Sequence, residues 1–81
     1  MNDKTRLFKI VTDDQAKVHK TLYEVYNSLK ERGYNPTDQI VGYLISGDLG
    51  YISSYQDARS KIKTIDRSKI VEVLLTSFLT K

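Results

Sequence analysis

The sequence predicts an all-α fold: a compact bundle of four to five short helices with a mobile N-terminal arm, assembled as a homodimer. Three observations support this. Apolar residues recur at helical spacing in several segments, and a helix stop is followed at once by a helix start at residues 33–36. A chain of 81 residues without cysteine also has a thin core, which a second copy can complete.

The chain divides into an arm, residues 1–12, and a single helical domain, residues 13–81. The arm mixes basic with apolar residues and shows no sustained helical period. We therefore expect it to be flexible, although residues 7–11 are also compatible with a short strand or a docking segment.

Residues 14–32 form the most regular predicted helix. Paired aspartates at positions 13 and 14 suit the positive N-terminal end of a helix, whereas Lys30 and Arg32 suit the negative C-terminal end. Gly33 then stands where a left-handed residue commonly ends a helix. The apolar face of this helix comprises Val18, Leu22, Val25, Tyr26 and Leu29.

A second, shorter helix is expected directly after this stop. Asn35 can cap it, Pro36 suits its first turn, and Gly47 with Asp48 ends it. Its predicted apolar face contains Ile40, Val41, Leu44 and Ile45, with Tyr43 beside it.

Two further helices are predicted after an ordered loop over residues 46–54. Ser54 with Asp57 is a weak capping signature for the third helix, and either Asp66 or Ser68 can cap the last one. The last helix has a wide apolar face, which we expect the core and a partner subunit to share: Ile70, Val71, Leu74, Leu75 and Phe78.

The composition argues against an enzyme, a cofactor and a membrane protein. There is no cysteine, and the single histidine, His19, lies inside a predicted helix, where we expect it to be solvated. No second histidine stands at metal-ligand spacing, so no metal is predicted. No segment approaches the roughly 20 apolar residues of a membrane span, and we expect a cytoplasmic protein.

Basic charge is concentrated in residues 59–69, which carry five basic side chains and one aspartate, a net charge of +4. Such a segment favours an anionic partner. Arg59, Lys63 and Arg67 are the candidate phosphate-binding or partner-binding residues, because arginine can hold an anion with two parallel hydrogen bonds. A nucleic acid bound by this helix is the alternative, although a net charge of only +3 for the chain makes it less favoured. A solvated helix face is equally compatible with the pattern.

Two other features are candidate sites. The loop residues Asp48, Tyr51 and Tyr55 can form a recognition surface, since binding residues concentrate on ordered loops, although a plain turn explains Gly47 and Gly50 equally well. Thr5 lies in the arm between two basic residues. A phosphate there would add about −1.5 to −2 charge and could attach the arm to the basic helix.

The chain resembles the IreB/ReoM family of Firmicutes over essentially its whole length. The matching motifs are Gly33-Tyr34-Asn35-Pro36, Gln39-Ile40-Val41-Gly42-Tyr43-Leu44, Ser46-Gly47-Asp48, Tyr51-Ile52 and Asp57-Ala58-Arg59. The resemblance implies a small helical homodimer that is a substrate of a membrane-bound PASTA-domain Ser/Thr kinase and its cognate phosphatase. It further implies a role in cell-wall synthesis and antibiotic resistance.

In the picture that the resemblance suggests, the unphosphorylated form promotes degradation, through Clp-protease machinery, of the enolpyruvyl transferase that commits precursors to peptidoglycan. Phosphorylation relieves this effect. Thr5 matches the acceptor, and Arg59, Lys63 and Arg67 match basic positions of the family. The chain departs from the family pattern at Asn2, where some members have a second threonine, at the Leu49-Gly50 pair, where Pro-Ala is usual, and at Lys63-Thr64, which replaces a more arginine-rich pair.

Overall fold

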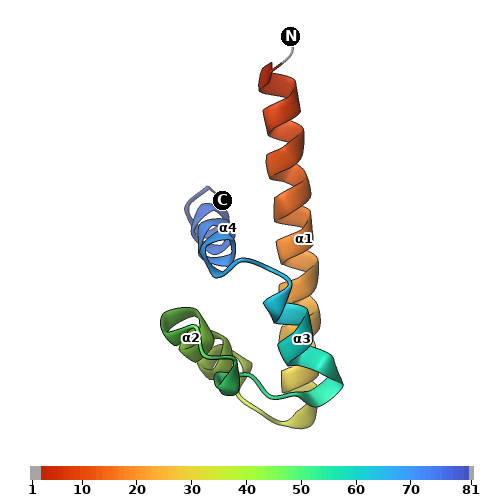
Figure 1. Ribbon diagram of the computed structural model, residues 1–81, viewed down its shortest axis with the longest axis vertical. Coiled ribbons are helices and arrows are strands. Elements are labelled where there is room, and N and C mark those ends of the chain that lie inside the picture. The colour runs from red at the N-terminus through yellow and green to blue at the C-terminus, as the bar shows by residue number, and fades with distance from the viewer. Residues whose placement is uncertain (1–2, 81) are drawn as a thin grey trace.

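Helix α1 (Asp3–Arg32) sets the length of the molecule. The computed structural model describes the backbone of residues 3–80 and the side chains of residues 14–80. At about 1.5 Å per residue, the 30 residues of α1 span about 45 Å, close to the longest dimension of 48 Å. The N-terminal turns of α1 extend beyond every other element (Figure 1).

The start of α1 differs from the sequence prediction, which placed it near residue 14. The backbone is helical from Asp3, so α1 is a long helix rather than one of several short ones. The physical reason is the lack of a helix-breaking residue: residues 3–13 contain neither glycine nor proline, so nothing in the sequence stops the helix at residue 14. The mobility expected of the arm stays a prediction, and its first two residues lie outside the described ones.

The corner between α1 and α2 (Pro36–Ser46) was correctly predicted. Gly33 has a φ of +94°, and the amide of Tyr34 donates to the carbonyl oxygen of Leu29 at 3.0 Å. The side-chain oxygen of Asn35 then accepts a hydrogen bond from the amide of Asp38 at 3.1 Å, with Pro36 in the first turn of α2. One helix is therefore closed and the next opened by local groups alone.

The loop after α2 is built from tight turns. Gly47 ends α2 in the left-handed conformation, with a φ of +77°. A 3₁₀ turn, η1 (Leu49–Tyr51), follows, and Asp48 caps it by accepting the amide of Gly50 at 2.8 Å. We call residues 44–52 the connector. It joins the last residues of α2 to η1 and ends at Ile52, whose side chain is fully buried.

The predicted start of the third helix is wrong in detail. A second 3₁₀ turn, η2 (Tyr55–Asp57), precedes α3 (Ala58–Lys63), and neither Ser54 nor Asp57 makes a side-chain capping bond. Gln56 and Asp57 instead adopt left-handed backbone angles, with φ of 50° and 61°. These angles interrupt the regular spacing that a capping box requires.

Helix α4 (Arg67–Leu79) begins after Asp66, one of the two predicted caps. Asp66 occupies the capping position by its backbone angles but makes no side-chain capping bond, and the alternative, Ser68, lies inside the helix.

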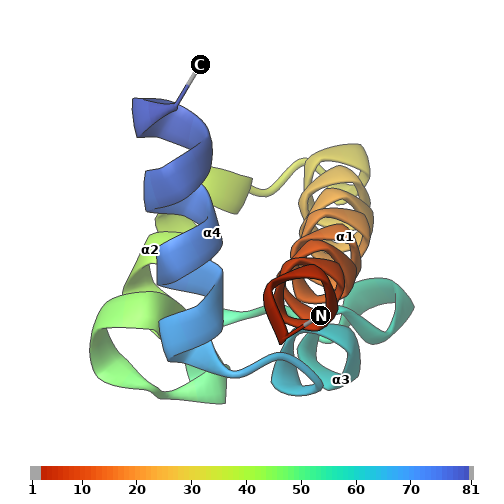
Figure 2. The same cartoon turned by 90° about the horizontal axis from the view of Figure 1, so that it is seen from above.

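Helices α1 and α3 lie side by side, and α2 and α4 both lie on the other side of the molecule, at different heights along its long axis (Figures 1 and 2). The core contains residues from all four helices and consists of Val18, Val25, Leu29, Tyr43, Ile52, Ala58, Ile62, Ile65, Ile70 and Val73. The all-α prediction is thus confirmed, with four α-helices among residues 3–80. Within that part of the chain, no helix is long and apolar enough to cross a bilayer.

Candidate functional site

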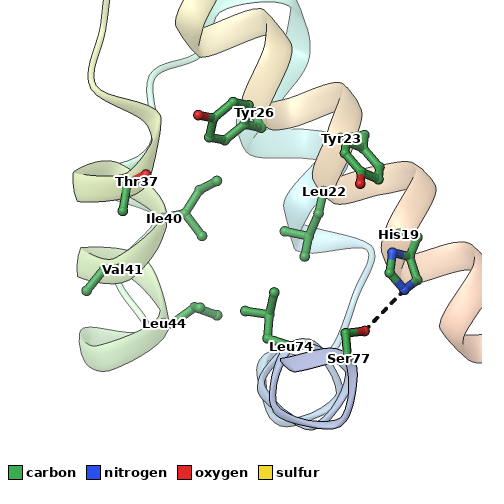
Figure 3. A pocket seen from close by; sticks show the side chains of 10 residues that line it. All are labelled: His19, Leu22, Tyr23, Tyr26, Thr37, Ile40, Val41, Leu44, Leu74 and Ser77. Carbon is green, nitrogen blue, oxygen red and sulfur yellow. Dashed lines mark hydrogen bonds between the residues drawn. The ribbon is translucent and has the colours of Figure 1, made fainter. Parts of the chain in front are cut away.

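An apolar groove opens between α1, α2 and α4. It has a volume of about 460 Å³, and Figure 3 shows side chains from all three helices pointing into it. Its lining is made of Leu22, Ile40, Val41, Leu44 and Leu74, with the more polar His19, Tyr23, Tyr26, Thr37 and Ser77 at its margin. At one end, Oγ of Ser77 lies 3.5 Å from Nε2 of His19, whose ring also stacks on that of Tyr23.

A second hollow of about 340 Å³ adjoins the groove on the α2 and α4 side, because Val41, Leu44 and Leu74 line both. We call its lining the α2–α4 face: Val41, Leu44, Ile45, Val71, Leu74, Leu75 and Phe78. Ile45 is 81% exposed and Leu75 is 57% exposed. Contiguous apolar surface of this kind commonly marks a contact with another protein.

The sequence predicted part of this surface. It placed five residues of α4 on one apolar face that the core and a partner subunit were expected to share. The structure shows which of them the core buries, and the partner's share stays a prediction. Ile70 is fully buried, whereas Val71, Leu74 and Leu75 are exposed. In α1, Leu22 and Tyr26 belong to the predicted apolar face, whereas His19 and Tyr23 were not predicted to line the groove, because they lie off that face. The surplus of tyrosine was the one available signal, since tyrosines favour interfaces.

Arg59 does not point away from the protein as a free cation. Its Nε donates to the carbonyl oxygen of Ile52 at 2.6 Å and to that of Leu49 at 3.1 Å. Arg59 thereby ties the first turn of α3 to the far end of the connector.

Arg67 holds the other end of the connector. Its Nη1 donates to the carbonyl oxygen of Leu44 at 2.9 Å. Its guanidinium group also lies against Gly47, where an added Cβ would stand 2.8 Å from Nη2. The group therefore sits at the C-terminal end of α2, where the helix dipole favours a positive charge.

The other cations of the basic segment have different surroundings. Lys63 is exposed, and its side chain forms no hydrogen bond or ion pair with any residue from 14 to 80. Nζ of Lys69 lies 3.8 Å from a carboxylate oxygen of Asp14 and 3.6 Å from one of Glu72. Of the three predicted partner-binding residues, Arg59 and Arg67 therefore share a contact, the connector, and Lys63 does not.

Two of the predicted loop residues shape the connector. Asp48 is exposed and caps η1. The ring of Tyr51 lies across α2 at Gly42, where an added Cβ would overlap Cδ1 of the ring. Tyr51 is nevertheless 51% exposed, so one side of its ring remains available to a partner.

Tyr55, the third predicted loop residue, lies at a different place. Its hydroxyl donates to Oε1 of Glu31 at 2.9 Å, and the guanidinium carbon of Arg32 stands 5.8 Å from the centre of its ring. The hydrogen bond to Glu31 is the main reason that the pKa of Tyr55 is raised above its ordinary value of 10. Tyr55 therefore fastens η2 to the end of α1.

The backbone of Thr5 belongs to the projecting end of α1, and its side chain lies outside the described ones. Among the described side chains, no three histidine or acidic groups gather in a way that would hold a metal ion.

The family described as IreB regulatory phosphoprotein matches residues 3–80 of the chain. The match spans all four helices and the segment that contains Thr5. The resemblance seen in the sequence motifs is therefore confirmed. So is the prediction that the chain is not an enzyme, because the family is one of regulatory proteins.

Proposed function

The chain belongs to the IreB regulatory phosphoprotein family, and we propose that it is a cytoplasmic adaptor switched by phosphorylation at Thr5. The enzymes that set the switch are a PASTA-domain Ser/Thr kinase and its cognate phosphatase. The observation that carries the proposal is the match over residues 3–80, because it includes the segment with Thr5.

The process under control is the synthesis of cell-wall precursors, and with it antibiotic resistance. The unphosphorylated adaptor promotes Clp-protease turnover of the committing enolpyruvyl transferase, and the phosphorylated form does not. A non-enzymatic protein must act through its surfaces. Two surfaces support such a role. The α2–α4 face exposes apolar side chains on two helices, and the connector contains a turn that Asp48 caps.

Access to Thr5 follows from the shape of α1. Its N-terminal turns project beyond the rest of the molecule, where the backbone of no other described helix runs beside them (Figure 1). Isolated helices shorter than about 12–15 residues are marginal in water. Residues 3–12 therefore unwind at low cost and act as the flexible arm that a kinase active site can bind.

The adaptor works as a homodimer, and the α2–α4 face is its interface. Residues on two helices present a contiguous apolar surface, with Val41 46% exposed and Leu74 45% exposed. A two-fold axis would bring this face against itself, which is the usual geometry of homodimers. The interface would supply the apolar burial that a single domain of this size lacks.

Phosphorylation can be tested with the purified chain and the host's PASTA-domain kinase. Intact-mass spectrometry should show one added phosphate, and fragmentation should place it on Thr5. The Thr5→Ala variant should remain unmodified. A phosphate elsewhere that is retained in Thr5→Ala would refute Thr5 as the switch.

A further inference from the structure

We propose that Arg59 and Arg67 are positioning residues: together they hold the connector, residues 44–52, as one rigid docking surface for a protein partner. The partner contacts the connector, and the two arginines act through its shape rather than by offering their charge. The inference rests on the proposed function only for its readout in cells.

The contact of Arg59 requires a guanidinium group. One nitrogen, Nε, serves the carbonyl oxygens of both Leu49 and Ile52. The Leu49 oxygen also accepts the amide of Ile52 at 3.0 Å, so the arginine reinforces the turn that η1 itself makes. The Nε atom of arginine lies within a planar group on a short stem, whereas lysine offers a single ammonium at the end of a flexible chain. Lysine at this position would keep the charge and lose the geometry.

The contact of Arg67 acts on the opposite end of the connector. Its hydrogen bond reaches the carbonyl oxygen of Leu44, and its guanidinium group fills the space that the absent Cβ of Gly47 leaves. The amide of Gly47 donates to the carbonyl oxygen of Tyr43 at 2.7 Å in the same turn. One arginine from α3 and one from α4 therefore fix the two ends of a nine-residue segment.

The fixed connector presents Asp48 and Tyr51 to solvent. One carboxylate oxygen of Asp48 accepts the amide of Gly50, and the exposed side chain leaves the carboxylate open to a cation. The half-exposed ring of Tyr51 offers an apolar surface that its packing on Gly42 orients. The partner that fits is a protein with a basic group for Asp48 next to an apolar surface for Tyr51.

Four variants of the full chain test this proposal by amide hydrogen exchange. Arg59→Lys and Arg67→Lys keep the charge and remove the planar donors, so the amides of Gly47, Tyr51 and Ile52 should exchange about tenfold faster. Lys63→Ala removes one charge from the same segment and should leave these amides unchanged. Asp48→Asn keeps an oxygen that can accept the amide of Gly50 and should also preserve protection.

The amide of Leu29 in α1 reports whether each variant still folds, and its protection should stay at the wild-type level. The proposal is overturned if both lysine variants protect the connector as well as the wild type does. It is also overturned if the faster exchange in the connector is matched by an equal loss of protection at Leu29, because the arginines would then stabilise the whole fold and not the connector.

Enolpyruvyl transferase levels in cells show whether the partner depends on the shape of the connector or on the charge of the arginines. Arg59→Lys, Arg67→Lys and Asp48→Asn should each weaken the control of enolpyruvyl transferase levels, and Lys63→Ala should retain it. In the reverse pattern, the lysine variants are active and Lys63→Ala is inactive. That result would show that the partner recognises the positive charges themselves, and it would overturn the proposal that the arginines act by holding the connector. If the wild type itself does not affect the transferase, the proposed function fails, and hydrogen exchange still decides whether the arginines position the connector.

Discussion

Apolar side chains are buried on the side of the molecule formed by α1 and α3, but several of them are exposed on the side formed by α2 and α4. Between α1 and α3, apolar side chains such as Leu29 and Ile62 are fully buried. On α2 and α4, Ile45 is 81% exposed and Leu75 57% exposed, although both stand on faces with a regular apolar pattern. The pattern alone therefore identifies which residues avoid water, but not whether the same chain or another one covers them.

The largest expected effect is on the buried side. Leu29→Ala should reduce the free energy of unfolding by about 2–5 kcal/mol, because it leaves a cavity in a closed core. Urea unfolding of the purified variant measures this loss. The matched change on the open side, Ile45→Ala, should cost much less at concentrations where the chain is monomeric. Equal losses in the two variants would contradict the contrast between the sides.

A smaller effect is expected where the connector meets α2. Gly42→Ala would place a Cβ that overlaps the ring of Tyr51, and such overpacking costs about 1–3 kcal/mol. Thermal unfolding should show a lower melting temperature for this variant. In the double variant with Tyr51→Ala the clash is gone, so the combined loss should be smaller than the sum of the single losses. Strict additivity would mean that the ring does not lie on Gly42.

Ile45→Lys should leave the monomer almost as stable as the wild type, since substitutions of exposed residues usually change the free energy of unfolding by less than about 0.5 kcal/mol. Its effect should fall on association instead, because it places a charge in the proposed interface. Sedimentation velocity at micromolar concentration should show a dimer for the wild type and a monomer for the variant. A wild-type monomer under these conditions would remove the α2–α4 face as a dimer interface.

The smallest effect is expected at the exposed bond between Tyr55 and Glu31. The pKa of Tyr55 is raised in the folded state, so folding favours the protonated phenol. The bond therefore contributes to stability below pH 10 and is lost as the pH rises through the folded-state pKa. Tyr55→Phe should be slightly less stable than the wild type near neutral pH, and the difference should vanish in alkaline solution. A difference that grows with pH would contradict the assigned cause.

The features predicted correctly from the sequence are local ones. Asn35, Pro36 and Gly47 act on backbone groups within four residues of themselves, so their roles follow from spacing alone. The corresponding prediction for α3 failed at the left-handed angles of Gln56 and Asp57, because a positive φ is uncommon for any residue other than glycine and could not be expected at two successive positions.

The roles of Arg59 and Arg67 could not be predicted, because their acceptors are backbone carbonyl groups. Every residue carries such an oxygen, and the carbonyl of Leu44 is 23 residues away from Arg67 in the sequence. The sequence of a basic segment is therefore the same whether its side chains bind a partner or donate hydrogen bonds to the protein's own backbone. For Thr5 the sequence motifs and the family match are informative, and the fold adds only its place at the projecting end of α1.

The central claim, a switch at Thr5, is tested most directly by the level of the enolpyruvyl transferase in cells. Thr5→Ala cannot be phosphorylated, so the transferase should fall below its wild-type level, and removal of the adaptor should restore it. The same transferase level in Thr5→Ala cells, wild-type cells and cells without the adaptor would contradict the claim.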